Sequence, residues 1–459
     1  MKLEQIHSVH FLGIGGIGMS ALARWFQANG FAVTGYDKTP TALTKDMASE
    51  GINIHFVDEL SMIPDRIKID PKGAIIIYTP AIPKELKQYN YFLNKGFEVL
   101  KRSQVLGFLT KEKFTIAVAG THGKTTTSSM IAHLLKYSGV DCSAFIGGIM
   151  TNYDSNLLIG KDDDVMVVEA DEFDRSFLTL HPDIAIITAT DADHLDIYGS
   201  KDSLKDSFMD FIGNIKSNGK LFIEEKAASE LNLNEVKNIS IQTYGLDSGD
   251  VSTNDLTIAN SKFNFEYSSP TESIEDFALA MPGFHNVLNA LAALTASRGL
   301  VSDPKTLVEG LNSYRGVKRR FEYIIDNDDQ VFIDDYAHHP AEIEALLNST
   351  KALYPNKKIT VIFQPHLFTR TRDFVTGFAE SLSLADHVLL LDIYPARELP
   401  IEGVTSDIIK ELITTQVISF KKNEVLGYLE NHYPEVLLTV GAGDIDTLVE
   451  PIKSKLLTI

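Results

Sequence analysis

One stretch constrains the fold more than any other: Ala117-Val-Ala-Gly-Thr-His-Gly-Lys-Thr-Thr-Thr127. The apolar, β-branched run 114–118 precedes it, and a helical pattern over 125–137 follows it. A glycine-rich turn between a strand and a helix is typical of a phosphate-binding loop. Gly120 and Gly123 let backbone N–H groups curve around an anion, and the following helix adds the positive end of its dipole.

The motif also suggests a role for two polar side chains. Lys124 can reach the outer phosphates of a nucleoside triphosphate, and the hydroxyl of Thr125 can bind Mg²⁺. The strict G-x-x-x-x-G-K pattern would have glycine at position 118, where this chain has Val118. The alternative is an ordinary strand-to-helix turn with a chance lysine, but the flanking strand and helix favour a phosphate loop.

Length and charge narrow the class of protein. A chain of 459 residues suggests about three domains. The formal net charge of −20 argues against nucleic acid or an anionic membrane as the main partner. Cys142 is the single cysteine, which excludes an internal disulfide and a thiolate metal cluster. With no signal-peptide core and no run of about 18 apolar residues, we expect a cytoplasmic protein without a membrane span.

A second glycine-rich turn lies near the N-terminus. Gly13, Gly15 and Gly18 fit G-x-G-x-x-G, between a strand and a helix expected over 19–29, and a second strand over 31–36 ends at Asp37. This is the Rossmann fingerprint, in which a diphosphate sits on a helix N-terminus and a carboxylate meets a ribose. A UDP-sugar meets both demands as well as NAD does. The strand 74–78 leads into the loop 79–83, at the edge where open α/β sheets bind ligands.

Acidic residues follow two strands of the central region. The strand 165–169 ends in Glu169, and the strand 184–188 is followed by Asp193 and His194. These groups leave parallel-looking strands as the phosphate loop does, so we expect all three at one sheet edge. Carboxylates beside a triphosphate suggest cations, which favours Glu169 and His194 as metal ligands. The alternative is helix-capping acids and a structural histidine.

The rest of the chain completes an α/β pattern. Residues 225–281 suggest a small antiparallel insertion, and His285, Asn286 and Asn289 open a helix that runs to about 297. The basic cluster 314–322 suggests an inter-domain hinge, and Lys101-Arg-Ser103 a domain boundary. Strands at 331–335, 358–363, 388–393 and 435–440 form a third α/β unit.

We therefore expect an α/β protein of three domains. Residues 1–102 would form a Rossmann-like domain that binds a UDP-substrate, and residues 103–316 a central P-loop ATPase-type domain. Residues 317–459 would form a C-terminal Rossmann-like domain on the amino-acid side of the reaction.

As a set, these motifs resemble the Mur ligases, the ATP-dependent amide-bond-forming enzymes of peptidoglycan precursor synthesis. The resemblance covers essentially the whole chain. It rests on the stretches His10 to Ser20, Gly120 to Thr127, Glu169-Ala-Asp-Glu172, Asp193-His194, His285 to Asn289, Arg319-Arg-Phe321, Asp334 to Pro340 and Gln364-Pro-His366.

The resemblance implies a reaction and its small-molecule partners. ATP would phosphorylate the lactyl carboxylate of UDP-N-acetylmuramate, and the amine of L-alanine would attack the acyl phosphate. The residues it assigns as catalytic are Lys124, His194 and Arg320, and those that hold Mg²⁺ are Thr125, Glu169 and His194. The residues that it assigns to ATP binding are Gly120, Thr121, His122, Gly123, Lys124, Thr125, Thr126, His285, Asn286, Asn289, Arg320 and Asp335. Asn289 can instead support the phosphate loop.

The resemblance assigns the substrates as well. The UDP-substrate would contact Gly15, Gly16, Ile17, Gly18, Asp37, Thr79, Pro80 and Ala81, and the amino acid His366 and Arg370. Relatives often carry arginine directly after the motif histidine, where this chain has Leu367, so Arg370 would bind more of the carboxylate. Some relatives use a carbamylated lysine for a second cation; Lys201 and Lys205 lie in that region, and nothing selects either.

Three other functions remain open at this point. An NAD(P)-dependent oxidoreductase would explain the first glycine-rich turn but not the phosphate loop. A recycling branch of the same family joins a preformed tripeptide to UDP-N-acetylmuramate and shares both turns. A nucleotide-binding switch without condensation is the non-enzymatic reading.

Overall fold

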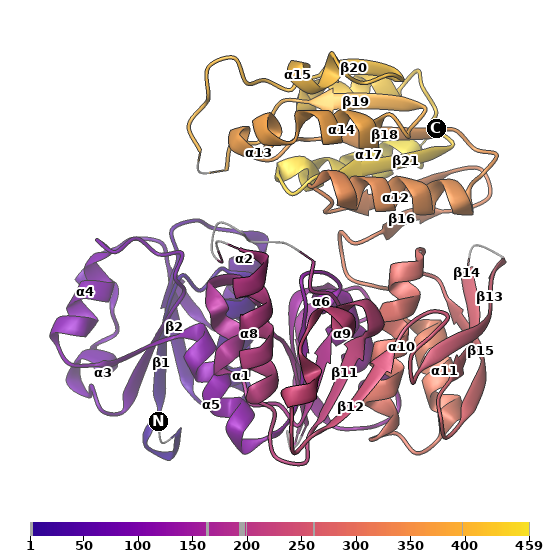
Figure 1. Cartoon of the computed structure of the whole chain (residues 1–459). Coiled ribbons are helices and arrows are strands. Elements are labelled where there is room, and N and C mark those ends of the chain that lie inside the picture. Colours follow the sequence, from indigo (N-terminus) through magenta and orange to yellow (C-terminus); the bar gives the residue numbers. More distant parts are fainter. Residues whose placement is uncertain are drawn as a thin grey trace. The chain divides into compact units, whose positions relative to one another are not determined.

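The computed structural model describes residues 3–161, 165–191, 198, 200–259, 262–396 and 398–458 (Figure 1). Its chain divides into two compact units. Unit 1 comprises Met1–Leu256, Phe265–Ala278 and His285–Tyr314, and unit 2 comprises Thr257–Asn264, Leu279–Phe284 and Arg315–Ile459. No helix in the described ranges is long and apolar enough to cross a membrane.

The N-terminal part of unit 1 is a five-stranded parallel sheet in the order β3-β2-β1-β4-β5. Its strands are β1 (Ser8–Leu12), β2 (Ala32–Tyr36), β3 (Asn53–His55), β4 (Ala74–Tyr78) and β5 (Glu98–Lys101). The helices are α1 (Ile17–Ala28), α2 (Ala42–Ser49), α3 (Asp65–Ile69), α4 (Lys87–Asn94) and α5 (Arg102–Glu112), with 3-10 turns η1 (Leu3–Gln5) and η2 (Leu60–Met62). Every residue of β1 is buried, as expected for a parallel strand covered on both faces. The strand order reverses at β1, so the loops after β1 and β4 lie at the switch point where such sheets bind ligands.

A seven-stranded sheet in the order β12-β11-β10-β6-β9-β7-β8 forms the centre of unit 1. Its strands are β6 (Phe114–Ala119), β7 (Cys142–Met150), β8 (Ser155–Leu158), β9 (Val165–Glu169), β10 (Ile184–Ile187), β11 (Lys220–Glu224) and β12 (Ser240–Tyr244). The helical elements are α6 (Lys124–Tyr137), η3 (Phe173–Thr179), α8 (Lys201–Gly213), α9 (Glu225–Glu230), η4 (Leu233–Glu235), α10 (Phe284–Arg298) and α11 (Pro304–Ser313). Because β6 pairs in parallel with both β10 and β9, the loops after these strands leave one edge of the sheet.

The expected insertion over 225–281 is wrong in its first part. β12 continues the central sheet in parallel with β11. A separate sheet begins only at residue 252 and contains β13 (Ser252–Ala259), β14 (Lys262–Ser268) and β15 (Ser273–Leu279). β12 is mostly half-exposed, as an edge strand is. A local sequence pattern can indicate a strand but does not give its pairing partner.

Unit 2 carries a six-stranded sheet in the order β16-β17-β21-β18-β19-β20, in which β16 is antiparallel to β17. Its strands are β16 (Glu322–Asp326), β17 (Val331–Asp335), β18 (Ile359–Phe363), β19 (His387–Leu391), β20 (Gln416–Phe420) and β21 (Val436–Val440). The helical elements are α12 (Pro340–Leu353), α13 (Phe368–Asp373), α14 (Val375–Leu382), α15 (Asp407–Lys410), η5 (Lys422–Glu424), α16 (Val425–Leu429), η6 (Asp444–Leu448) and α17 (Val449–Leu456). One apolar cluster packs the sheet against α12 and α14 and another against α16 and α17, which confirms the expected third α/β unit.

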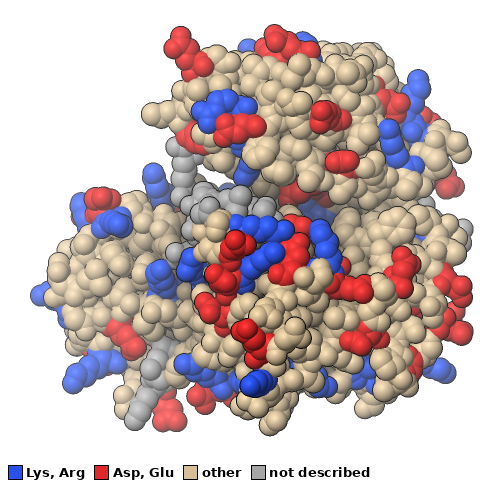
Figure 2. All heavy atoms as spheres, viewed as in Figure 1, with Lys and Arg blue, Asp and Glu red and all other residues tan. Residues whose placement is uncertain are grey.

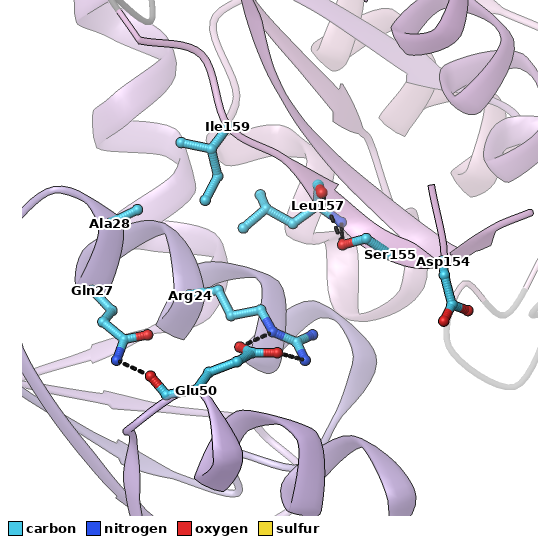
Figure 3. A pocket seen from close by; sticks show the side chains of 8 residues that line it. All are labelled: Arg24, Gln27, Ala28, Glu50, Asp154, Ser155, Leu157 and Ile159. Atoms are coloured by element: carbon cyan, nitrogen blue, oxygen red, sulfur yellow. Dashed lines mark hydrogen bonds and ion pairs between the residues drawn. The ribbon is translucent and has the colours of Figure 1, made fainter. Parts of the chain in front are cut away.

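Within unit 1 the N-terminal and central sheets share one hydrophobic core. Trp25 of α1 packs on Phe145 of β7 with ring centroids 6.4 Å apart. Fully buried Asn156 of β8 donates to the carbonyl of Ile17 at 2.6 Å and accepts from Arg24 at 3.2 Å. A cavity of about 450 Å³ opens beside the contact between the two sheets, and Arg24 in its lining donates a hydrogen bond to Glu50 (Figure 3). None of the predicted site residues that the structure describes lines it.

Candidate active site

The loop after β6 has the backbone of a phosphate-binding turn. Gly120 has φ +132°, and a Cβ there would lie 2.2 Å from the Thr188 hydroxyl. Gly123 caps α6 with φ +81°, and a Cβ there would lie 2.5 Å from the Asn289 side chain. Both glycines are therefore required by conformation and by space. Thr121 donates its N–H to the carbonyl of Ala189 at 3.0 Å, which fixes the loop against the strand edge.

Lys124 is the first residue of α6 and has a carboxylate partner. Its Nζ lies 2.8 Å from Glu172 and donates to the carbonyl of Gly120 at 2.7 Å. The Glu172 side chain is 1% exposed. Burial raises the pKa of Glu172, and the neighbouring Lys124 opposes that shift. Sequence reasoning used only Glu169 of the Glu169-Ala-Asp-Glu172 run and missed this pair.

The expected metal ligands are partly placed. The Thr125 hydroxyl donates to Glu169 at 2.9 Å, and the other oxygen of Glu169 accepts from the backbone of Gly147 at 2.8 Å. A hydroxyl and a carboxylate are oxygen ligands of the kind Mg²⁺ prefers, so these two residues fit the ion. His194 and Asp193 lie outside the described residues. Within the described ranges, no group of three or more His, Cys, Asp or Glu side chains is arranged to hold a metal.

The other residues predicted for ATP in unit 1 surround the same loop. Asn289 accepts from the Thr127 hydroxyl at 3.1 Å and donates to Asn286 at 3.2 Å. Both asparagines are buried, so Asn289 supports the loop, the alternative that the sequence left open. His285 is exposed at the start of α10, His122 is exposed in the loop, and Thr126 is buried in α6.

The glycine-rich turn near the N-terminus contacts Asp37 after β2 and Thr79 after β4. Gly16 caps α1, and Gly15 donates its N–H to the carboxylate of Asp37 at 2.7 Å. A Cβ at Gly13, where φ is +84°, would lie 2.5 Å from the methyl group of Thr79. Asp37 therefore shapes the turn, in addition to any contact with a ribose.

The remaining residues predicted for the UDP-substrate lie at the same switch point. Ile17 and Gly18 form the first turn of α1. Thr79 follows β4 and donates its N–H to the carbonyl of Leu12 at 3.3 Å, and Pro80 and Ala81 are exposed beyond it. The loop after β4 thus sits beside the glycine-rich turn, as the sequence predicts.

In unit 2, the two arginines of the basic cluster have different environments. Arg319, with φ +61°, contacts Asp334 at 3.2 Å and stacks on Tyr336. Arg320 is exposed. Both oxygens of Asp335 accept backbone N–H groups, from Phe321 at 2.6 Å and Ala337 at 2.7 Å, while burial raises the pKa of Asp335 to about 6. Asp335 therefore shapes the segment that presents Arg320.

His366 and Arg370 lie beyond the end of β18. His366 stacks on Tyr394 with an interplanar angle of 18°, and burial, then Arg370 and His338, lower its pKa to about 4. His366 Nδ1 and one terminal nitrogen of Arg370 are buried without a hydrogen-bond partner among the described residues. Asp373 pairs with the neighbouring Arg372 at 2.7 Å.

Lysines and carboxylates gather over α8 and α9 (Figure 2). Lys201 and Lys205 both contact Glu230, at 2.9 and 3.5 Å, and Lys226 contacts Asp191 at 2.8 Å. Because the two candidate lysines share one carboxylate, the geometry does not select either for carbamylation.

Family models match almost the entire chain. The Mur ligase family catalytic domain matches residues 8–114, the Mur ligase middle domain residues 118–297, and the Mur ligase glutamate ligase domain residues 319–443. The chain belongs to the Mur ligase family. This confirms the expected family, and the three matched segments follow the three predicted α/β parts. The predicted boundaries at 102 and 316 remain predictions.

Full-length relatives at 44–48% identity share one name. The UDP-N-acetylmuramate–L-alanine ligase of Flavobacterium psychrophilum is 48% identical over 457 residues, which are 99% of each chain. That of Porphyromonas gingivalis is 47% identical over 455 residues, which are 98% of this chain and 99% of the relative. The structure of the UDP-N-acetylmuramate-alanine ligase MurC of Thermotoga maritima has a TM-score of 0.82 at 29% identity, and 98% of this chain and 99% of that chain are covered.

Proposed function

We propose that this Mur ligase family member joins L-alanine to the lactyl carboxylate of UDP-N-acetylmuramate at the expense of ATP. The observation that carries the proposal is the phosphate loop with Lys124, built beside a second glycine-rich turn in the same unit. One turn suits a nucleoside triphosphate and the other a nucleoside diphosphate group. Relatives at 47–48% identity that match over their full length carry the name of this activity.

The first step transfers the γ-phosphoryl group of ATP to the carboxylate. Negative charge spreads over the phosphoryl oxygens in the transition state, and the protein lowers the barrier mainly by neutralising that charge and by positioning the reactants. Lys124 supplies a cation from α6, and the N–H groups of the loop supply aligned dipoles. Thr125 and Glu169, with His194, would hold a magnesium ion, which would supply further charge neutralisation.

The second step needs an amine with a free electron pair. Arg370 can bind the carboxylate of L-alanine through two parallel N–H···O bonds. The lowered pKa keeps His366 neutral at pH 7, so its unpartnered ring nitrogen can accept a hydrogen bond from the amino group. The amine then attacks the acyl carbon, the bond from that carbon to the phosphate oxygen breaks, and inorganic phosphate leaves with the proton that the nitrogen gives up.

Phosphate release with UDP-N-acetylmuramate and ATP tests this function. Release should depend on L-alanine in a panel that contains serine, glycine and a stem tripeptide. The Lys124→Ala variant should lose release while its thermal unfolding stays that of a folded protein. Release with the tripeptide alone would favour the recycling branch, and release without any amino acid would favour the switch. Near-normal turnover in Lys124→Ala would remove the centre of the proposal.

A cheap control addresses the oxidoreductase alternative. NADH fluorescence should not change on adding the protein if the N-terminal turn is built for a UDP-sugar. Quenching that UDP-N-acetylmuramate does not reverse would contradict the proposed use of the turn.

A further inference from the structure

Arg102, which the sequence marked only as part of a domain boundary, lies against the N-terminal glycine-rich turn. A Cβ placed on Gly18 would lie 2.2 Å from its Nη1 and 2.9 Å from its Cζ. Gly18 is the second residue of α1, so the guanidinium rests on the first turn of that helix. The absence of a side chain at position 18 gives Arg102 its place.

This position concentrates positive potential. Arg102 is the first residue of α5, where a cation opposes the helix dipole. It also lies on the N-terminal turn of α1, whose first N–H groups have no partner within the helix. The positive N-terminal ends of α1 and α5 and the guanidinium of Arg102 therefore lie together, and this arrangement favours the binding of an anion.

The carboxylates around the guanidinium leave it available to a ligand. Asp171, in the loop after β9, approaches Arg102 to 3.9 Å, longer than a hydrogen bond, and the two side chains are 41% and 30% exposed. Such a loose, exposed pair contributes little stability. The other acid at this turn, Asp37, already accepts N–H groups from Gly15 and Thr39.

We infer that Arg102 is a further ligand of the diphosphate of UDP-N-acetylmuramate. The inference rests on the proposed function, because it assumes that the turn binds a UDP-sugar. A guanidinium can give two parallel hydrogen bonds to phosphate oxygens, which an ammonium cannot reproduce. Gly18 then has two uses: close approach of the backbone to the diphosphate, and space for the arginine.

Calorimetric titration tests the role without requiring turnover. UDP and UDP-N-acetylmuramate are titrated into the wild type, Arg102→Gln, Arg102→Lys and Lys111→Gln. Lys111 is the matched control, because it is an exposed cation in the last turn of the same helix. Arg102→Gln should weaken both UDP ligands tenfold or more, Arg102→Lys should be intermediate, and Lys111→Gln should bind as the wild type does. ADP, measured on each variant, should keep its Kd within twofold.

The possible outcomes separate the two claims. A wild type that does not bind UDP-N-acetylmuramate would contradict the proposed function itself. A wild type that binds it, with Arg102→Gln equally tight, would overturn the role of Arg102 alone. Equal weakening of UDP and ADP in Arg102→Gln, or a matching loss in Lys111→Gln, would also overturn it, because the effect would then be damage to the fold or bulk charge.

Discussion

At the scale of single residues, the two arginines of α13 offer a matched comparison. Arg370 has a buried nitrogen without a partner among the described residues, whereas Arg372 is paired with Asp373 at the surface. Arg370→Lys should raise the KM for L-alanine and lower kcat/KM by about ten- to a hundredfold, since a charge-assisted bond is worth roughly 1.5–3 kcal/mol. The KM for ATP should barely move.

Arg372→Lys serves as the control for this comparison, because a surface ion pair contributes little. Steady-state kinetics of phosphate release measure both variants. If Arg370→Lys kept the alanine KM of the wild type, the carboxylate site would have to be sought elsewhere in unit 2.

Glu172 gives a second prediction at this scale. It holds Lys124 at 2.8 Å in a buried position and so competes with phosphate oxygens for the ammonium. Glu172→Gln should therefore tighten ADP binding, by roughly fivefold for a change of about 1 kcal/mol. Calorimetry measures it, and UDP binding provides the internal control. Weaker ADP binding would instead make Glu172 a residue that positions Lys124 for the nucleotide.

The site residues that sequence reasoning found are those that belong to local motifs. Gly120, Gly123 and Lys124 are readable because one loop contains them all. The partners of Lys124 and of Gly18 come from residues far along the chain, Glu172 at a separation of 48 residues and Arg102 from another helix. No local spacing reports such contacts, because the sheet order brings them together.

At the scale of elements, β1 and α4 enclose a polar network inside the N-terminal sheet. Buried His10 contacts Thr34 at 2.8 Å and Gln88 at 3.2 Å, and Gln88 contacts His55 at 2.8 Å. Burial lowers the pKa of His10 to about 3, with His55 adding to the shift and Gln88 opposing it. The pKa of His55 is also lowered, mainly by burial, with Gln88 and then Asp58 opposing that shift.

The pH dependence follows from these directions. Between pH 6.5 and about 3 the unfolded chain binds a proton at His10 that the folded chain does not, so stability falls as the pH falls. The slope due to one such group reaches about 1.4 kcal/mol per pH unit. Chemical unfolding from pH 7 to 5 should show a smaller decline in His10→Gln than in the wild type. His7→Gln, which changes an exposed ring, is the control; equal declines in all three proteins would contradict the account.

Most elements could be predicted from hydrophobic runs, and the misplaced insertion shows the limit. β6 was expected at 114–118 and spans Phe114–Ala119. β12, by contrast, joins the central sheet although it lies within the segment expected to form a separate insertion. Whether a segment forms a strand is a local property, whereas the strand that it pairs with depends on the strand order of the whole sheet.

At the scale of the whole molecule, the residues predicted for ATP are divided between the two compact units, with Lys124 in unit 1 and Arg320 in unit 2. The link between Tyr314 and Glu322 contains Gly316 at φ +84°, a conformation that favours glycine. If Lys124 and Arg320 contact the same nucleotide, both units bind it, and we predict domain closure on binding. Small-angle scattering should show a smaller radius of gyration with a non-hydrolysable ATP analogue and UDP-N-acetylmuramate. An unchanged radius would count against the assignment of Arg320.

The contact between the N-terminal and central sheets of unit 1 limits the exchange of domains between relatives. Trp25 and Phe145 form one aromatic contact from two sheets, and buried Asn156 binds the first turn of α1. A chimera cut at residue 102 would leave half of this contact on each parent and would lose complementarity unless α1, β7 and β8 were transferred together. Exchange of the N-terminal domain at this boundary is therefore disfavoured. Substitutions at Trp25, Phe145 and Asn156 should occur together among relatives.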